Sequence, residues 1–198
     1  MENKEAKTLV NFFEAVGKLK KIKRTGWLNN GVSRQESESV SDHCLRVSAM
    51  ALFLGKKLGC NQEKLVKMAL LHDLHESACG DLTLDYTKYG SSPGFTPEEK
   101  DRLELEGMEK FFAILDASGK QESKEFRELW LEAEEKKTLE ARILHELDKL
   151  ELLLQASEYH RQGKGRKDLF PLFDKVNNES VKTPLLRGIL SEIEARTP

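Results

Sequence analysis

The chain has 198 residues, with 32 basic and 34 acidic side chains and a formal net charge of −2 at pH 7. This balance argues against a dedicated nucleic-acid surface, and no apolar run approaches the roughly 20 residues that span a bilayer. The length is sufficient for one domain with a real core, so we expect a single domain over 1–198. The start M-E-N-K-E-A-K lacks a secretory segment, and Cys44, Cys60 and Cys79 have no C-x-x-C spacing, so we expect a cytoplasmic protein with reduced thiols.

Apolar residues recur at helical spacing through the first part of the chain. We predict helices over about 5–22 and 41–58, separated by a loop rich in Gly, Asn and Ser from 25 to 39. Gly59 is of the residue type that ends a helix. Asn61 is of the type that caps the next one, which is predicted to run to about residue 78.

Residues 79–95 break the helical pattern and predict a long irregular connection, a kind of segment that is more often functional than idle. Thr96 then begins a capping box, with Pro97 at the first helical position. Helices are predicted over about 97–117, 122–136, 138–162 and 183–195. No β-alternation or internal repeat stands out, so the pattern predicts an all-α bundle with the motif-bearing helices at its centre.

Two histidines and two aspartates lie inside apolar, helix-periodic runs: His43, His72, Asp73 and Asp148. A buried imidazole or carboxylate is costly unless something inside the fold binds it. Any one of them alone is more often a satisfied core histidine or a capping aspartate. Converging from three helices, the four would hold one divalent cation, with Mn²⁺, Co²⁺, Ni²⁺, Zn²⁺, Fe²⁺ and Mg²⁺ all open as its identity. The set therefore favours a metal-dependent hydrolase.

The order H…HD…D resembles the HD-domain superfamily of metal-dependent phosphohydrolases, which implies a helical bundle with a metal site between its central helices. Longer stretches resemble the 5′-deoxynucleotidase branch of that superfamily, the YfbR-type proteins and their eukaryotic relatives. These stretches are R-T-G-W from Arg24, E-S-V-S-D-H up to His43, H-D-L-H-E-S-A-C-G-D from His72, and L-D-K-L-E-L-L-L-Q-A-S-E-Y from Leu147. The resemblance covers about residues 8–160 and leaves a C-terminal helical extension.

The resemblance implies hydrolysis of deoxyribonucleoside 5′-monophosphates to deoxynucleoside and phosphate, by a homodimer that binds a small-molecule nucleotide and neither nucleic acid nor membrane. His43, His72, Asp73 and Asp148 match the metal ligands, and Glu76 matches a catalytic glutamate beside the metal. A phosphomonoester dianion needs a cation to offset its charge and a water that is nucleophilic near neutral pH, and a divalent metal supplies both. Glu76 could orient that water or protonate the leaving 5′-oxygen.

Three further residues match substrate contacts in the same branch. Arg24 matches a phosphate-binding arginine, whose planar fork of donors suits phosphate oxygens. Asp81 matches a residue that contacts the sugar 3′-hydroxyl, and Trp27 a tryptophan that packs on the deoxyribose. In the bacterial members the Arg and Trp are adjacent, whereas two residues separate them here. From the residues alone, Asp81 could equally be a turn or N-cap residue and Trp27 an interfacial aromatic.

Two more histidines lie near the motif residues in sequence. His75 is three residues from His72 and His145 is three from Asp148, spacings that permit co-location on a helix face. We interpret both as supporting or surface residues and leave a second metal open. Residues 82–95 directly follow Asp81 and contain two glycines, which favours a lid over the site.

Two alternative functions stay open. One is another HD phosphohydrolase, either a guanosine-tetraphosphate hydrolase or a cyclic-nucleotide phosphodiesterase. The tetraphosphate enzymes carry a Glu-Asp pair just after the HD motif, whereas Ser77 follows Glu76 here. The other is a nonenzymatic metal-binding helical module, which the intact ligand set with Glu76 and Arg24 disfavours.

Overall fold

The computed structural model describes residues 2–87, 93–118 and 123–197. Its helices are α1 (Glu2–Lys18), α2 (Thr25–Asn29), α3 (Val40–Leu54), α4 (Gln62–Leu71), α5 (Glu76–Cys79), α6 (Pro97–Leu115), α7 (Lys124–Glu135), α8 (Leu139–Arg161), α9 (Leu169–Asn177) and α10 (Pro184–Ala195). Short 3₁₀ turns lie at Lys56–Leu58, Asp116–Ser118 and Asn178–Ser180. The described residues contain no strand and two isolated bridges, between Lys23 and Ser39 and between Leu84 and Phe95, so the predicted all-α class is confirmed.

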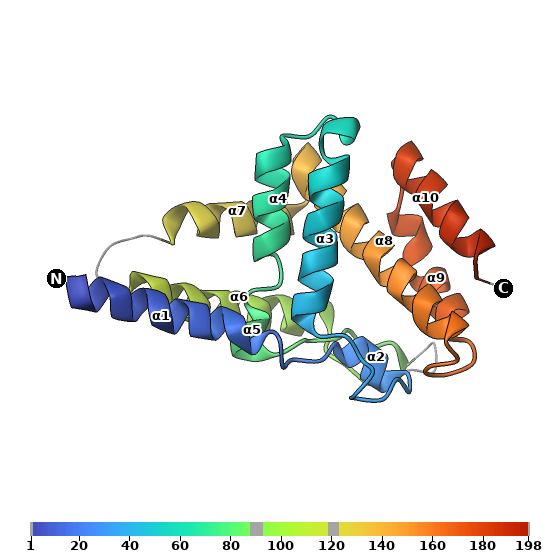
Figure 1. Ribbon diagram of the computed structural model, residues 1–198, viewed down its shortest axis with the longest axis horizontal. Helices are drawn as coiled ribbons and strands as arrows, with labels where there is room; N and C mark the ends of the chain where they lie inside the picture. Colours follow the sequence, from blue (N-terminus) through green and yellow to red (C-terminus); the bar gives the residue numbers. More distant parts are fainter. Residues whose placement is uncertain (1, 88–92, 119–122, 198) are drawn as a thin grey trace.

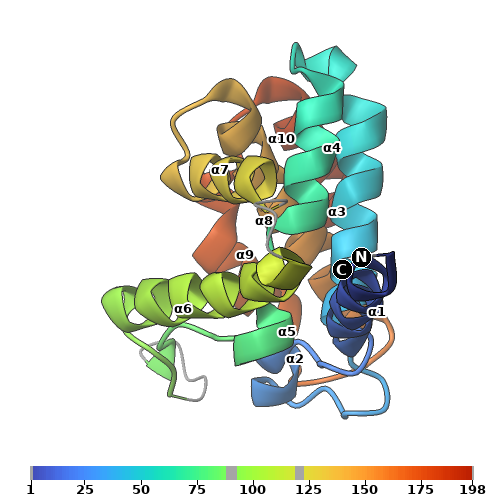
Figure 2. The same ribbon diagram turned by 90° about the vertical axis from the view of Figure 1, so that its left-hand side faces the viewer.

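The helices surround one long central element, α8. Figure 1 shows α3 and α4 side by side, with α8 next to them and with α9 and α10 on its other side. Figure 2 shows α1 and α6 lying across one end of the α3–α4 pair. None of the described helices combines the length and the apolar character that a membrane crossing requires.

The main hydrophobic core joins α8 to its neighbours. Residues with no exposed surface come from five helices, and examples are Val47, Leu65, Leu147, Leu169 and Leu190. Full burial of each such side chain contributes roughly 1.5–3 kcal/mol. Helices α9 and α10 therefore pack on the same core as the helices that carry the sequence motifs.

Two predicted helix starts are confirmed by their capping bonds. The Thr96 hydroxyl accepts a hydrogen bond from the Glu99 amide at 3.2 Å, and the Glu99 carboxylate accepts one from the Thr96 amide at 3.0 Å. Asn61 Oδ1 accepts from the Lys64 amide at 3.1 Å. These bonds satisfy amides that the first turn of a helix otherwise leaves without partners.

The prediction of one helix from 61 to about 78 is wrong. Helix α4 ends at Leu71, and α5 begins only at Glu76. Between them the backbone bonds tighten to i→i−3, as from the Leu74 amide to the Leu71 carbonyl at 3.1 Å. The intervening turn carries the His-Asp pair, which therefore lies at a helix end and not on a continuous helical face.

Other boundaries also differ from the sequence prediction. The predicted loop 25–39 contains α2, and the stretch before 183 contains α9. Helix α3 ends at Leu54, and Gly59 ends the following 3₁₀ turn with a left-handed φ of 76°. Residue 122, the predicted start of the helix observed as α7, and residues 88–92 of the predicted lid lie outside the described residues.

Gly107 brings α6 close to α5. A Cβ atom at this position would lie 2.9 Å from Cys79 Sγ and 3.2 Å from the His75 carbonyl oxygen. We expect Gly107→Ala to lower the free energy of unfolding by roughly 1–3 kcal/mol, because overpacking outweighs the better helix propensity of alanine. Gly188→Ala in α10 is the matched control: nothing lies within 4 Å, so a gain of about 0.5–1 kcal/mol is expected. Urea unfolding checks both, and equal effects would contradict close α5–α6 packing.

Candidate metal centre and adjoining pocket

The structure brings the four predicted metal-ligand residues together from α3, α4 and α8. His43 lies in the first turn of α3, which a capping box fixes: the Ser39 hydroxyl accepts from the Asp42 amide, and the Asp42 carboxylate accepts from the Ser39 amide at 2.8 Å. His72 is the C-cap residue of α4, and Asp73 follows it in the turn. Asp148 lies in the middle of α8.

His43, His72 and Asp73 each place one donor atom within 4.8 Å of the others, and Asp148 approaches this group at His43. His43 Nε2 lies 3.3 Å from His72 Nε2, 3.6 Å from Asp73 Oδ2 and 3.2 Å from Asp148 Oδ1. His72 Nε2 lies 3.3 Å from Asp73 Oδ2. Nitrogen and carboxylate oxygen donors at such separations suit a single divalent cation between them.

Nδ1 of each histidine has a hydrogen-bond partner, which orients the ring so that Nε2 can face a metal. His43 Nδ1 lies 2.5 Å from Glu151 Oε2, and both side chains are fully buried. His72 Nδ1 lies 2.7 Å from the Ala69 carbonyl oxygen. A proton on each Nδ1 leaves the Nε2 lone pair free, the usual arrangement of metal-binding histidines. The residues present therefore fit a metal ion.

Glu151→Gln is expected to weaken metal binding. The carboxylate raises the basicity of His43 and fixes its tautomer, and losing such a partner costs roughly 10–100-fold in metal affinity. Competition with a chelating dye measures the affinity. Glu158→Gln is the matched control, because Glu158 lies on the same helix and also contacts the Arg46 that neighbours Glu151. Equal affinities for the two variants would show that Glu151 does not support His43.

Besides Glu151, a second buried carboxylate, that of Glu38, lies close to His43. Glu38, His43 and Glu151 each place one donor atom within 4.8 Å of the others. Glu38 Oε1 accepts a hydrogen bond from Trp27 Nε1 at 2.8 Å. Burial, followed by the nearby charge of Glu151, raises the pKa of Glu38 to about 7. Sequence reasoning missed Glu38 and Glu151, although Glu151 follows Asp148 at the i+3 spacing that puts both on one helix face.

Arg24 lies beside the four ligand candidates and is surrounded by carboxylates. Its Nη1 is 3.2 Å from Asp73 Oδ2, 3.5 Å from Asp81 Oδ1 and 4.0 Å from Glu76 Oε1. Burial raises the pKa of Glu76 well above its ordinary value, and the charges of Asp73 and Asp81 add to this effect. The structure thus brings Glu76 to the site at the start of the separate helix α5, and not within the single helix to residue 78 that the sequence predicted.

Asp81 and Trp27 both border the site, and each also has a structural role. The Asp81 carboxylate accepts a hydrogen bond from the Thr25 amide at the start of α2, and the Thr25 hydroxyl donates to the Asp81 carbonyl at 2.8 Å. Trp27 exposes only 1% of its surface, and its ring stacks on Phe173 with centroids 4.5 Å apart. Trp27 is therefore a buried residue behind the pocket, with little area for direct contact.

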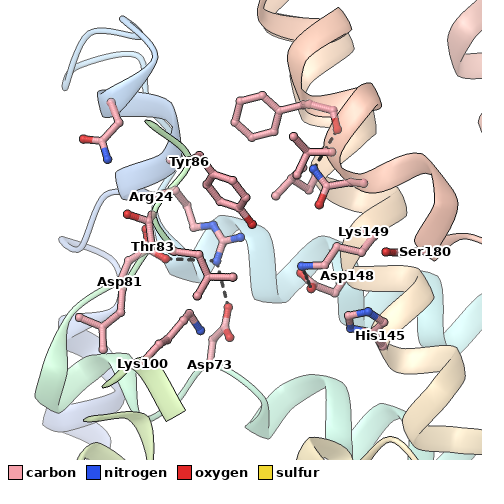
Figure 3. A pocket seen from close by; sticks show the side chains of 18 of the residues that line it. Arg24, Asp73, Asp81, Thr83, Tyr86, Lys100, His145, Asp148, Lys149 and Ser180 are labelled. Carbon is pink, nitrogen blue, oxygen red and sulfur yellow. Dashed lines mark hydrogen bonds and ion pairs between the residues drawn. The ribbon is translucent and has the colours of Figure 1, made fainter. Parts of the chain in front are cut away.

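A pocket of about 510 Å³ opens onto these residues. Figure 3 shows Arg24, Asp81 and Tyr86 on one side of it, and Asp148, Lys149 and Ser180 on the other. Lys149 Nζ lies 3.0 Å from Asp148 Oδ2. Tyr86, Lys149 and the lining residue Phe173 were not predicted as site residues, because they come from three separate segments, the connection before α6, α8 and α9, which only the tertiary fold brings to one pocket.

The two additional histidines lie in different surroundings. His75 is buried against α6, with Nε2 3.4 Å from Glu104 Oε1 and its ring edge against Trp130, so it is not a surface residue. His145 lines the pocket. Burial lowers its pKa to about 4, with a further contribution from the charges of Lys136 and Lys149.

Comparison with known proteins gives concordant matches. A family model described as the HD domain matches residues 16–184. The 5′-deoxynucleotidase HDDC2 of Dictyostelium discoideum is 36% identical, with 94% of this chain and 96% of that protein covered. The Homo sapiens protein of the same name is 34% identical, with 96% and 86% covered. Among solved structures, the PH0347 protein from Pyrococcus horikoshii OT3 superposes with a TM-score of 0.74 at 30% identity, covering 94% of this chain and 99% of that one.

Proposed function

This chain belongs to the HD-domain family, as its motifs predicted, and from that premise we propose that it is a metal-dependent 5′-deoxynucleotidase. The reaction is hydrolysis of a deoxyribonucleoside 5′-monophosphate to deoxynucleoside and phosphate. The observation that carries the proposal is that His72, Asp73 and Asp148 each place a donor atom within 3.6 Å of His43 Nε2, beside Arg24 and Glu76.

His43, His72, Asp73 and Asp148 would hold the metal. When bound, a divalent cation supplies charge neutralisation for the phosphate and a water that is nucleophilic near neutral pH. The Arg24 guanidinium, 3.2 Å from Asp73, is placed to bind phosphate oxygens next to that centre. Three carboxylates lie within 4.0 Å of Arg24 Nη1, and these ion pairs hold the guanidinium beside that centre before substrate arrives.

Glu76 and Asp81 contribute on the side of Arg24. Glu76 is buried and close enough to the guanidinium to transfer a proton at the phosphate that Arg24 binds. Asp81 fixes the start of α2, which carries Trp27, and its carboxylate lies at the pocket wall, where it would contact the sugar 3′-hydroxyl. Trp27 packs against the pocket residue Phe173, and through this contact it would limit the space for a 2′-hydroxyl.

We propose one domain over 1–198, supported by the core that α9 and α10 share with α3, α4 and α8. The absence of C-x-x-C spacing around three free cysteines supports a cytoplasmic location. The resemblance to the 5′-deoxynucleotidase branch supports a homodimer.

Phosphate release tests the function directly. Metal-stripped protein is resupplied with Mn²⁺, Co²⁺ or Mg²⁺ and offered each deoxyribonucleoside 5′-monophosphate, its ribo counterpart, a 3′-monophosphate and guanosine tetraphosphate. Metal-dependent release from the 5′-deoxy set is the expected result. Release from guanosine tetraphosphate alone would be consistent with the assigned metal centre but would show that the proposed substrate is wrong. If the protein binds metal but releases phosphate from none of these compounds, the proposal is contradicted.

A further inference from the structure

The pocket changes character along its length. Its acidic end, beside Arg24, is lined by Asp73, Glu76 and Asp148. Leu152 lies one helical turn beyond Asp148 on α8, about 6 Å along the helix axis and on the same face. There α9 adds three partly exposed apolar side chains, and the apolar wall consists of Leu152, Leu172, Phe173 and Val176.

The ring of Phe173 in this wall is held in a fixed orientation. Trp27 stacks on it at a centroid distance of 4.5 Å and an interplanar angle of 25°. Trp27 is in turn fixed by its hydrogen bond to Glu38 and by edge contact with Tyr159 at 5.3 Å. Gly26 also lies close to the Phe173 ring, since a Cβ built at this glycine would lie 3.9 Å from Phe173 Cζ. A ring anchored in this way is a preorganised platform for a flat ligand.

We propose that the apolar wall is the nucleobase subsite, with Phe173 as its stacking platform. This inference rests on the proposed function, which places the phosphate at the acidic end of the same pocket. A nucleobase has a flat face of low polarity, and a pocket lined by apolar and aromatic side chains fits that face. Tyr86, which Figure 3 shows projecting toward the pocket interior, would border the base on the opposite side.

The wall recognises the face of a base more than its edges. The polar lining residues that follow Phe173 and Val176 in the chain are Asn177 and Ser180, and the Asn177 amide already donates to the Phe173 carbonyl at 2.8 Å. Stacking is tolerant of sequence because every base has a π-face, whereas edge recognition needs committed donors and acceptors. We therefore expect similar KM values for purine and pyrimidine deoxynucleotides.

Phe173→Leu tests the subsite, because it removes the ring and keeps most of the bulk. We expect KM for deoxyribonucleoside 5′-monophosphates to rise roughly five- to tenfold, the lower range for loss of base–aromatic stacking. For 2-deoxyribose 5-phosphate, which has no base, both kcat and KM should stay unchanged. Phe170→Leu is the matched control: Phe170 lies on the same helix and is buried in the core, so its loss should leave KM unchanged. An unchanged KM in Phe173→Leu, or an equal rise for the base-free substrate, would overturn the subsite.

A binding measurement separates this inference from the proposed function. Calorimetric titration with deoxyadenosine, which carries no phosphate, needs no hydrolysis. Weaker binding to Phe173→Leu than to the wild-type protein supports the subsite even if the protein hydrolyses nothing in the panel. Equal affinity of the two proteins, or no binding to the wild-type protein, overturns it even if deoxynucleotides are hydrolysed.

Discussion

Asp148→Ala is expected to lose bound metal and phosphatase activity together. Asp148 Oδ1 lies 3.2 Å from His43 Nε2 and supplies the α8 side of the centre. Although burial alone would raise the pKa of Asp148, the nearby charge of Lys149 is the largest of the effects that hold this pKa well below its ordinary value. The carboxylate is therefore ionised at neutral pH, as a metal ligand must be. Losing a supporting residue costs roughly 10–100-fold in affinity or activity, so loss of a ligand should exceed about 100-fold.

Elemental analysis after gel filtration gives the metal content of this variant, and phosphate release gives its activity. Asp168→Ala is a suitable control, because Asp168 is an exposed aspartate that pairs with Arg166 in the connection before α9. Thermal unfolding shows whether both variants fold. A full metal complement in folded Asp148→Ala would mean that the ligand assignment is wrong.

Glu76→Gln is expected to lower kcat by roughly 10²–10⁴ and to leave the metal bound, since general acid–base catalysis contributes about that much. The side chain is 5% exposed and 4.0 Å from Arg24 Nη1. Its Oε2 is buried without a hydrogen-bond partner among the described residues. Glutamine preserves size and polarity but cannot exchange a proton at this place, so KM should change less than kcat.

Asp101→Asn is the control for this experiment, because Asp101 is an exposed carboxylate that also lines the pocket. Its loss should change kcat little. If Glu76→Gln released the metal as well, Glu76 would be needed for metal binding and its assignment to proton transfer would fail. If both variants kept full activity, neither carboxylate would take part in the reaction.

The sequence predicted the all-α fold and the residues of the candidate centre for a physical reason. Each of His43, His72 and Asp148 stands in an apolar helical run where an unpartnered polar group would be costly, so its position alone indicates an internal partner. The turn after Leu71 was not predictable in the same way. It contains neither glycine nor proline, and its i→i−3 bonds follow from packing of α5 against α6.

The parts of the site that sequence reasoning missed depend on tertiary packing. Helix α9 has only nine residues and contains Pro171, and its N-cap residue Asp168 makes no side-chain capping bond, so its helix signal in the sequence is weak. Phe173 reaches the pocket only because α9 packs on α8. Glu38 lies far from Glu151 in sequence, and their proximity follows from the way in which α3 and α8 meet around His43.

The early end of α4 also has an electrostatic consequence. The peptide dipoles of a helix sum to a partial negative charge at its C-terminus, where cations are stabilised. Because α4 stops at Leu71, this negative end lies next to His72 and Asp73. A cation near a helix C-terminus gains about 0.3–1 kcal/mol, which corresponds to a two- to fivefold gain in affinity. The backbone of α4 would thus assist the four side chains in holding the metal, and a helix continuing to residue 78 would have placed this charge elsewhere.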